Sequence, residues 1–254
     1  MKKTINMVLS IMLLLTAVSF AQNGKMDKEV AKLFNQGNKQ KRSGDFDGAL
    51  KSYTEALKKS KDARIYYQMS LVYKKKREFA KAEEMLNKCL EVDPKFYTAY
   101  NGLGTTFYSW GKYQKAIDNF KKYMENATNE SRKKVAKKYI GYAYTKLGDI
   151  ALKEKKYDEA TDYLMKAVAN YNYDKAYLKL ADIYLEKGKF NKALEAADNA
   201  ANFRKKVPKG ALYFYKGMAY KGLHNIAKAK ENFKKASKDR TYRDRCKYEL
   251  KYLH

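Results

Sequence analysis

The chain of 254 residues is poor in residues that commonly build catalytic and metal centres, with two histidines and two cysteines. His224 and His254 have no cysteine at the spacing of metal ligands, and no serine–histidine pairing can be argued. No glycine-rich phosphate loop follows a strand, and no strand is predicted. These absences exclude the usual patterns of metal, nucleotide and nucleophilic chemistry. We expect a protein that is not an enzyme and has no cofactor.

The two cysteines, Cys89 and Cys246, lie far apart in the chain. A disulfide requires Cα atoms within about 7 Å of each other, and an elongated repeat array would hold these two farther apart. We therefore expect no intramolecular bridge. Cys89 is expected to be a small buried residue, and Cys246 is expected to be exposed near the end of the chain, which leaves an intermolecular bridge through it open.

Long apolar runs are scarce as well, and the single one lies at the start of the chain. A basic Met-Lys-Lys start precedes an apolar run over residues 5–20, and Ser19 and Ala21 are small residues before a cleavage point. This pattern is typical of a secretory signal peptide at residues 1–21. It predicts an exported bacterial protein, periplasmic or associated with the outer membrane. A retained anchor is the alternative, but the run is short for a crossing of about 20 apolar residues.

Acidic residues are outnumbered, 28 against 55 basic ones, so the formal net charge is +27. Such an excess favours an acidic protein, an anionic membrane surface or nucleic acid as the partner. Export argues against nucleic acid. The lysines are also spread over nearly the whole chain beside acids, which fits a solvated lysine-rich surface. Nothing in the composition indicates an oligomeric state.

A short phrase that contains a large apolar residue followed by alanine recurs six times. The apolar residue falls at positions 46, 79, 113, 157, 190 and 226, so the steps are 33, 34, 44, 33 and 36 residues. A period near 34 residues is typical of stacked helical hairpins. The chain is therefore predicted to be an all-α solenoid.

The third copy shows how one hairpin is encoded. Apolar residues in its first helix are separated by gaps of 3, 4 and 3, the spacing of one helix face, at Tyr100, Leu103, Phe107 and Trp110. Gly111 then ends the helix, and a second helix begins at Tyr113. Gly104 and Ala116 are small residues where the two helices are expected to cross. Tyrosines at the repeat positions, Tyr157 among them, are expected to be core residues.

The recurring residues resemble those of the tetratricopeptide repeat family. They include the Leu103-Gly104 and Leu147-Gly148 pairs, the first-helix aromatic residues, and the alanine, aromatic and alanine of the second helix. The aromatic residues are Tyr66, Tyr100, Tyr144, Tyr177 and Tyr213, followed further along the helix by Tyr73, Phe107, Tyr184 and Tyr220. The resemblance covers about residues 30–241 and implies a right-handed superhelical solenoid of about six hairpins.

The resemblance and the composition together suggest boundaries along the chain. They are a signal peptide at 1–21, a flexible N-terminus at 22–29, repeats 1–3 at 30–128, an inserted basic segment at 129–140, repeats 4–6 at 141–241 and a capping helix at 242–254. The inserted segment accounts for the step of 44 residues, and Asn129 or Ser131 could cap an extended first helix there. It is either a tolerated insertion or a basic feature that contacts a partner.

The resemblance also implies a binding site, because first helices line a concave groove in this family. The implied groove residues are Phe34, Asn38, Lys41, Arg64, Tyr67, Leu71, Lys74, Asn101, Thr105, Tyr108, Tyr142, Thr145, Asp149, Lys175, Asp182, Phe214 and Met218, with Leu178 and Lys221 at equivalent positions. Such a lining suits an extended peptide or a partner helix. The family's clamp for a C-terminal carboxylate needs a lysine where this chain has Phe34, four residues before Asn38.

The expected function is thus a non-enzymatic scaffold of the cell envelope that holds an envelope or secreted protein in the groove. The alternative is a protein that binds an anionic lipid or polysaccharide surface through its lysine-rich faces.

Overall fold

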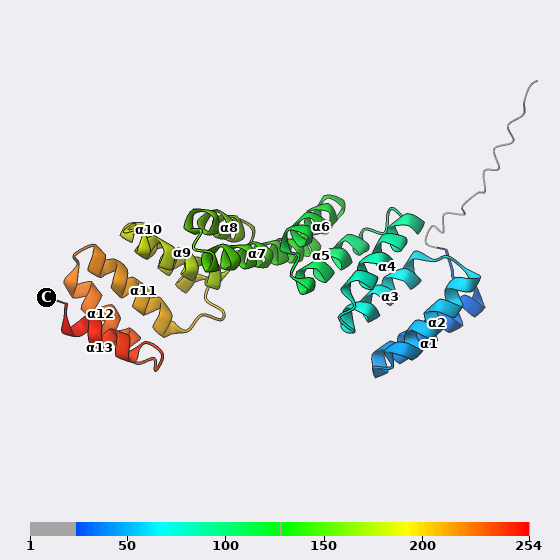
Figure 1. Cartoon of the computed structure of the whole chain (residues 1–254), viewed down its shortest axis with the longest axis horizontal. Helices are drawn as coiled ribbons and strands as arrows, with labels where there is room; N and C mark the ends of the chain where they lie inside the picture. Colours follow the sequence, from blue (N-terminus) through cyan, green and yellow to red (C-terminus); the bar gives the residue numbers. More distant parts are fainter. Residues whose placement is uncertain (1–23, 128, 254) are drawn as a thin grey trace, which may run out of the picture.

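A computed structural model describes residues 24–127 and 129–253, which form thirteen α-helices and no strand (Figure 1). The helices are α1 (Lys28–Ser43), α2 (Phe46–Lys59), α3 (Ala63–Lys75), α4 (Phe79–Val92), α5 (Thr98–Trp110), α6 (Tyr113–Asn126), α7 (Glu130–Lys153), α8 (Tyr157–Asn170), α9 (Asp174–Glu186), α10 (Phe190–Asn202), α11 (Lys209–Gly222), α12 (Ile226–Ala236) and α13 (Arg243–Lys251). Consecutive helices pair into six hairpins that follow one another along the long axis of the molecule, and α13 closes the C-terminal end. The predicted all-α solenoid is confirmed. The predicted signal peptide at 1–21 lies outside the described residues.

Each hairpin turns through one residue in the left-handed backbone conformation. The six positions are Gly44, Arg77, Gly111, Lys155, Gly188 and His224, with φ between 55° and 84°. The residue after each one donates its N–H to a carbonyl five residues earlier, as Lys112 does to Phe107 at 2.9 Å. This bond satisfies a carbonyl that the helix end leaves free. The turn therefore ends the first helix and starts the second at the large apolar residue of the repeat.

Within a hairpin, a small residue of the first helix accommodates a large residue sixteen positions later. A Cβ placed on Gly104 would lie 2.8 Å from the ring of Phe120, and one on Gly37 would lie 2.5 Å from the ring of Tyr53. Both rings are fully buried. The glycine thus lets an aromatic ring fill the space between the two helices, while Ala116 is buried beside it in the same core.

The long helix α7 carries residues 130–140 as its first turns. Its N-cap is Asn129, whose Oδ1 accepts a hydrogen bond from the Ser131 N–H at 2.8 Å. One side of this segment packs on the preceding hairpin: Ala136 is fully buried, and the ring of Tyr139 stacks on Phe120 with centroids 5.3 Å apart. The segment is therefore joined to the core, and its four lysines are exposed or half-buried.

Two burial predictions are wrong. Cys246 is fully buried, because α13 folds back on α12 and places its sulfur in a cluster with Phe214 and Phe233. Tyr157 is 42% exposed at the turn that opens α8, whereas Phe79 at the equivalent turn stacks on Trp110 of the following hairpin with centroids 6.0 Å apart. Cys89 is buried as expected, and both cysteines are free. The domain boundaries drawn from the sequence stay a prediction.

Candidate functional site: a tyrosine–lysine pocket on the first-helix face

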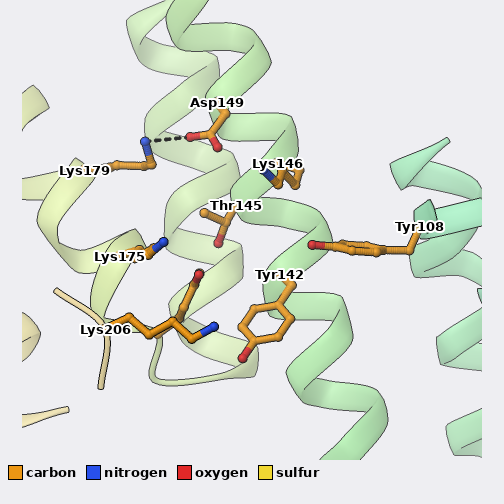
Figure 2. Close-up of a pocket in the computed structure, with 9 residues that line it drawn as sticks. Tyr108, Tyr142, Thr145, Lys146, Asp149, Lys175, Lys179 and Lys206 are labelled. Carbon is orange, nitrogen blue, oxygen red and sulfur yellow. Dashed lines mark ion pairs between the residues drawn. The ribbon is translucent and has the colours of Figure 1, made fainter. Parts of the chain in front are cut away.

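The first helices of the hairpins form one side of the array, called the first-helix face below, and α5, α7 and α9 enclose a pocket on it. The pocket has a volume of about 320 Å³. Its lining consists of Tyr108, Tyr142, Thr145, Lys146, Asp149, Tyr173, Lys175, Lys179 and Lys206. We call it the tyrosine–lysine pocket. Figure 2 shows Tyr108 reaching toward α7 from α5, with Lys175 and Lys206 directed toward α7 from the other side.

Helix α7 contributes one wall through residues spaced four and three apart. Tyr142, Lys146 and Asp149 share one face of the helix because of this spacing. Asp149 forms an ion pair with Lys179 of α9 at 2.8 Å, which joins the two walls (Figure 2). Thr145 is buried and donates its hydroxyl to the Gly141 carbonyl of its own helix at 2.8 Å.

The tyrosines of the pocket belong to a larger aromatic cluster. The ring of Tyr142 lies 4.7 Å from that of Tyr173 and 5.6 Å from that of Tyr171, and Tyr108 lies 6.1 Å from Tyr139. Burial raises the pKa of Tyr108 and Tyr173, and raises that of Tyr142 to about 12. The three phenols are therefore neutral at physiological pH and able to donate hydrogen bonds.

The loop between α10 and α11 supplies Lys206, and a buried carboxylate holds this loop in place. Asp174 is 1% exposed, and its Oδ2 accepts hydrogen bonds from the N–H groups of Lys205 at 2.7 Å, Lys206 at 2.6 Å and Val207 at 3.0 Å. Burial alone would raise the pKa of Asp174, but these backbone donors lower it overall. The backbone that carries Lys206 is thus fixed against the start of α9.

A second pocket adjoins the first on the same face. It has a volume of about 360 Å³ and shares Lys175, Lys179 and Lys206 with its neighbour. The rest of its lining is Leu178, Asp182, Val207, Pro208 and Tyr215. We call it the apolar pocket. A polar, basic cavity and an apolar one therefore lie next to each other across three lysines.

Some of the sequence-predicted residues are gathered on the first helices of the third, fourth and fifth hairpins. Those in the tyrosine–lysine pocket are Tyr108, Tyr142, Thr145, Asp149 and Lys175, and those in the apolar pocket are Lys175, Leu178 and Asp182. The placement of Phe214 on an open groove is wrong. Its side chain is 2% exposed, because α12 and α13 pack over it.

The other predicted residues do not converge on one pocket. Their basic groups are engaged by neighbours: Lys74 donates to the Thr105 hydroxyl at 2.9 Å, Lys41 donates to Gln68, and Arg64 pairs with Asp62 at 2.5 Å. Burial lowers the pKa of Lys41 and of Lys74. The remaining predicted residues, Phe34, Asn38, Tyr67, Leu71, Asn101 and Met218, are half-buried along their own helices.

Sequence reasoning missed Lys146, Tyr173, Lys179 and Lys206. Two of them carried a usable signal, because Lys146 lies four residues after Tyr142, and Lys179 lies four residues after Lys175, on shared helix faces. No helical spacing could have indicated Lys206, since it belongs to a loop. In residues 24–127 and 129–253, no three His, Cys, Asp or Glu side chains gather as a metal ion would require. Within the same ranges, no helix combines the length and apolarity needed to cross a bilayer.

Comparisons with known proteins agree on one repeat type. A tetratricopeptide repeat model matches residues 63–96 and 97–130, and a second tetratricopeptide repeat model matches residues 145–211. Together the matches span just over half of the chain. Among solved structures, the chain is similar to MamA 41-end from Desulfovibrio magneticus RS-1, with a TM-score of 0.51, 17% identity and coverage of 70% of this chain and 97% of that one. At this identity the likeness supports the fold alone.

The curated relatives are fungal and plant proteins. The chain is 29% identical over 103 residues to Small glutamine-rich tetratricopeptide repeat-containing protein 2 of Saccharomyces cerevisiae, covering 39% of this chain and 30% of that protein. It is 30% identical over 101 residues to Heat shock protein STI1 of the same yeast, covering 39% and 17%. The chain spans about a third or less of the length of these relatives.

These relatives overturn the predicted location. The expected periplasmic or outer-membrane-associated site in a bacterium is wrong, because the matched curated proteins come from eukaryotes, which have no periplasm. The apolar run behind that prediction is a pattern of composition in residues outside the described ranges. The expected envelope role depended on this location and is not retained. The argument from export against nucleic acid is not retained either.

Proposed function

The chain belongs to the tetratricopeptide repeat family, and from this premise we propose that it is a non-enzymatic scaffold that holds an extended, acidic segment of a partner protein. The observation that carries the proposal is the pair of adjoining pockets on the first-helix face, which share Lys175, Lys179 and Lys206. Cavities of about 320 and 360 Å³ suit individual side chains rather than a whole domain. Successive side chains of an extended segment could occupy them in turn.

Charge supports an acidic partner. Four lysines surround the tyrosine–lysine pocket against the single carboxylate of Asp149. The whole chain carries a formal charge of +27, so long-range attraction would speed the encounter with an acidic segment, and local complementarity would fix its register.

A peptide selection tests the proposal. Peptides displayed on phage are selected against the full chain, and the enriched ones are synthesised and measured by fluorescence polarisation. Leu178→Glu places a charge in the apolar pocket. It should lower the affinity for the selected peptides about tenfold or more, because an apolar contact is replaced by a desolvated carboxylate. The matched control is Met165→Glu, which changes an exposed apolar residue of α8, a second helix. Equal affinities for both variants and the wild type would reject the groove.

Binding to an anionic surface is the alternative that the charge suggests, and the same proteins decide it. Vesicles that contain acidic lipids are sedimented with the wild type and with Leu178→Glu. Retention of both proteins by the vesicles, together with a failure to enrich any peptide, would favour the surface over the groove. Enrichment of a peptide that binds the wild type in the absence of vesicles would favour the groove.

A further inference from the structure

The tyrosine–lysine pocket carries more positive charge than its own acid balances. Lys179 is paired with Asp149, whereas Lys146, Lys175 and Lys206 form no ion pair with any residue in the described part of the chain. Three cationic groups therefore face a cavity of about 320 Å³. One carboxylate would balance only one of them.

Neutral donors complete the lining. Tyr108, Tyr142 and Tyr173 surround the same cavity, and burial keeps their hydroxyls protonated by raising each pKa. Hydroxyl and ammonium groups donate hydrogen bonds to anionic oxygens, and bonds to charged acceptors are the stronger class. The pocket thus offers charge and directed donors together, which a merely solvated lysine surface does not.

The pocket is also held in shape before any ligand arrives. Asp174 fixes the backbone of Lys205, Lys206 and Val207, and the Asp149–Lys179 pair joins α7 to α9. Walls that are already positioned lose less conformational freedom when a ligand binds. The side chains of Lys146, Lys175 and Lys206 are themselves exposed, so what is fixed in advance is the backbone that carries Lys206 and the wall between α7 and α9.

We infer that the tyrosine–lysine pocket is a subsite for a group with a charge near −2 on the bound segment, and that the adjoining apolar pocket takes a large apolar side chain close to it in sequence. The inference rests on the proposed function, because the partner segment carries both groups. A phosphoryl group has about this charge and three acceptor oxygens, and two adjacent carboxylates match the same chemistry. The lysines shared by the two pockets place the anionic and apolar groups side by side.

Small anions test the charge directly on the full chain. Phenyl phosphate, succinate and acetate are titrated at constant ionic strength while backbone amide signals are followed by NMR. We expect shifts confined to residues 142–149, 173–179 and 205–207, and affinities for phenyl phosphate or succinate about tenfold or more above acetate. The order of phenyl phosphate and succinate identifies the preferred source of the double charge. Equal affinity for all three anions, or shifts scattered over lysines along the array, would overturn the inference.

A charge-matched pair of variants separates the pocket from general charge. Lys175→Gln with Lys206→Gln should weaken binding of the dianions about tenfold or more. Lys121→Gln with Lys230→Gln removes the same charge from α6 and α12, at positions that are equally exposed but do not line the pocket, and should change little. Equal losses in both pairs would contradict a built subsite. Circular dichroism of each variant reports whether the helices persist.

Peptides from the phage selection distinguish this inference from the proposed function. We expect them to carry a phosphorylatable or doubly acidic site with a large apolar residue within a few positions, and to lose affinity when that apolar residue becomes serine. Enriched peptides that lack acidic residues and bind the Lys175/Lys206 variant as tightly as the wild type would contradict the inference, while the proposed scaffold function would remain supported. Dianion binding without any enriched peptide would support the anion subsite and count against the scaffold.

Discussion

At the scale of single residues, the left-handed turn position sets up a direct comparison between repeats. Gly44, Gly111 and Gly188 occupy it in three hairpins, while Arg77, Lys155 and His224 occupy it in the other three at φ of 55° to 63°. A side chain with a Cβ is strained in this region, and glycine is not. The three non-glycine turns are therefore expected to be less stable than the same turns with glycine.

Lys155→Gly is expected to stabilise the protein by about 0.5–1 kcal/mol, the strain relieved less the greater freedom of glycine in the unfolded chain. Urea unfolding followed by circular dichroism measures the change. Gly188→Ala at the equivalent turn is the matched reverse substitution and should destabilise, since nothing lies within 4 Å of its added Cβ and only the backbone conformation, with φ of 66°, opposes it. A loss of stability in Lys155→Gly would contradict the strain argument.

Asp174 gives a prediction about pH. Its carboxylate is buried and accepts three backbone hydrogen bonds from the loop at 205–207, and its pKa lies below the ordinary value of 3.8. A lowered folded-state pKa means that the stabilisation is present above about pH 4 and is lost as the pH falls through the lowered value. Asp174→Asn should cost about 2 kcal/mol at pH 7 and less at pH 3.

Urea midpoints at the two pH values check this, with Asp244→Asn as the control because that carboxylate is 93% exposed. A cost for Asp174→Asn that stays the same at pH 3 would show that shape, rather than charge, holds the loop.

At the scale of elements, α13 is the cap that covers the last hairpin. It buries Cys246, and the residues after it bury Leu253, in one cluster with Phe214 and Phe233. Deleting residues 240–254 should lower the melting temperature and cause self-association, because terminal repeats with an uncovered apolar face are poorly soluble. Thermal unfolding and size-exclusion chromatography measure both effects. Tyr248→Ala, at a position that is 64% exposed, should leave both unchanged.

The elements were predictable where a local pattern specifies them. The gaps of 3, 4 and 3 before Gly111 predict a first helix that ends at Trp110, and the structure has α5 at Thr98–Trp110. Cys246 was not predictable in this way, since its burial depends on how α13 folds back on α12. Lys206 was equally hidden: its place in the pocket is set by Asp174, more than thirty residues earlier, through bonds to the backbone rather than through any helical spacing.

At the scale of the whole molecule, the positive net charge opposes folding and favours association with acidic partners. The chain carries 55 basic and 28 acidic residues, and like charges repel along an elongated array. Acids at the helix surfaces offset part of this through pairs such as Lys88–Glu84 at 2.6 Å and Lys166–Asp162 at 2.6 Å. Exposed pairs of this kind contribute about 0–1 kcal/mol each, so the unbalanced positive charge is the larger effect.

Added salt should therefore change stability and binding in opposite directions. Raising sodium chloride shortens the Debye length from about 10 Å at 0.1 M to about 3 Å at 1 M. Screening of the self-repulsion should raise the melting temperature by about 2–4 °C, which corresponds to about 1 kcal/mol for a chain of this size. The same salt should weaken the binding of acidic peptides selected against the first-helix face, because their attraction to the lysines is screened as well. Calorimetry and fluorescence polarisation in one salt series measure the two trends. A melting temperature that falls with salt would mean that the ion pairs outweigh the repulsion.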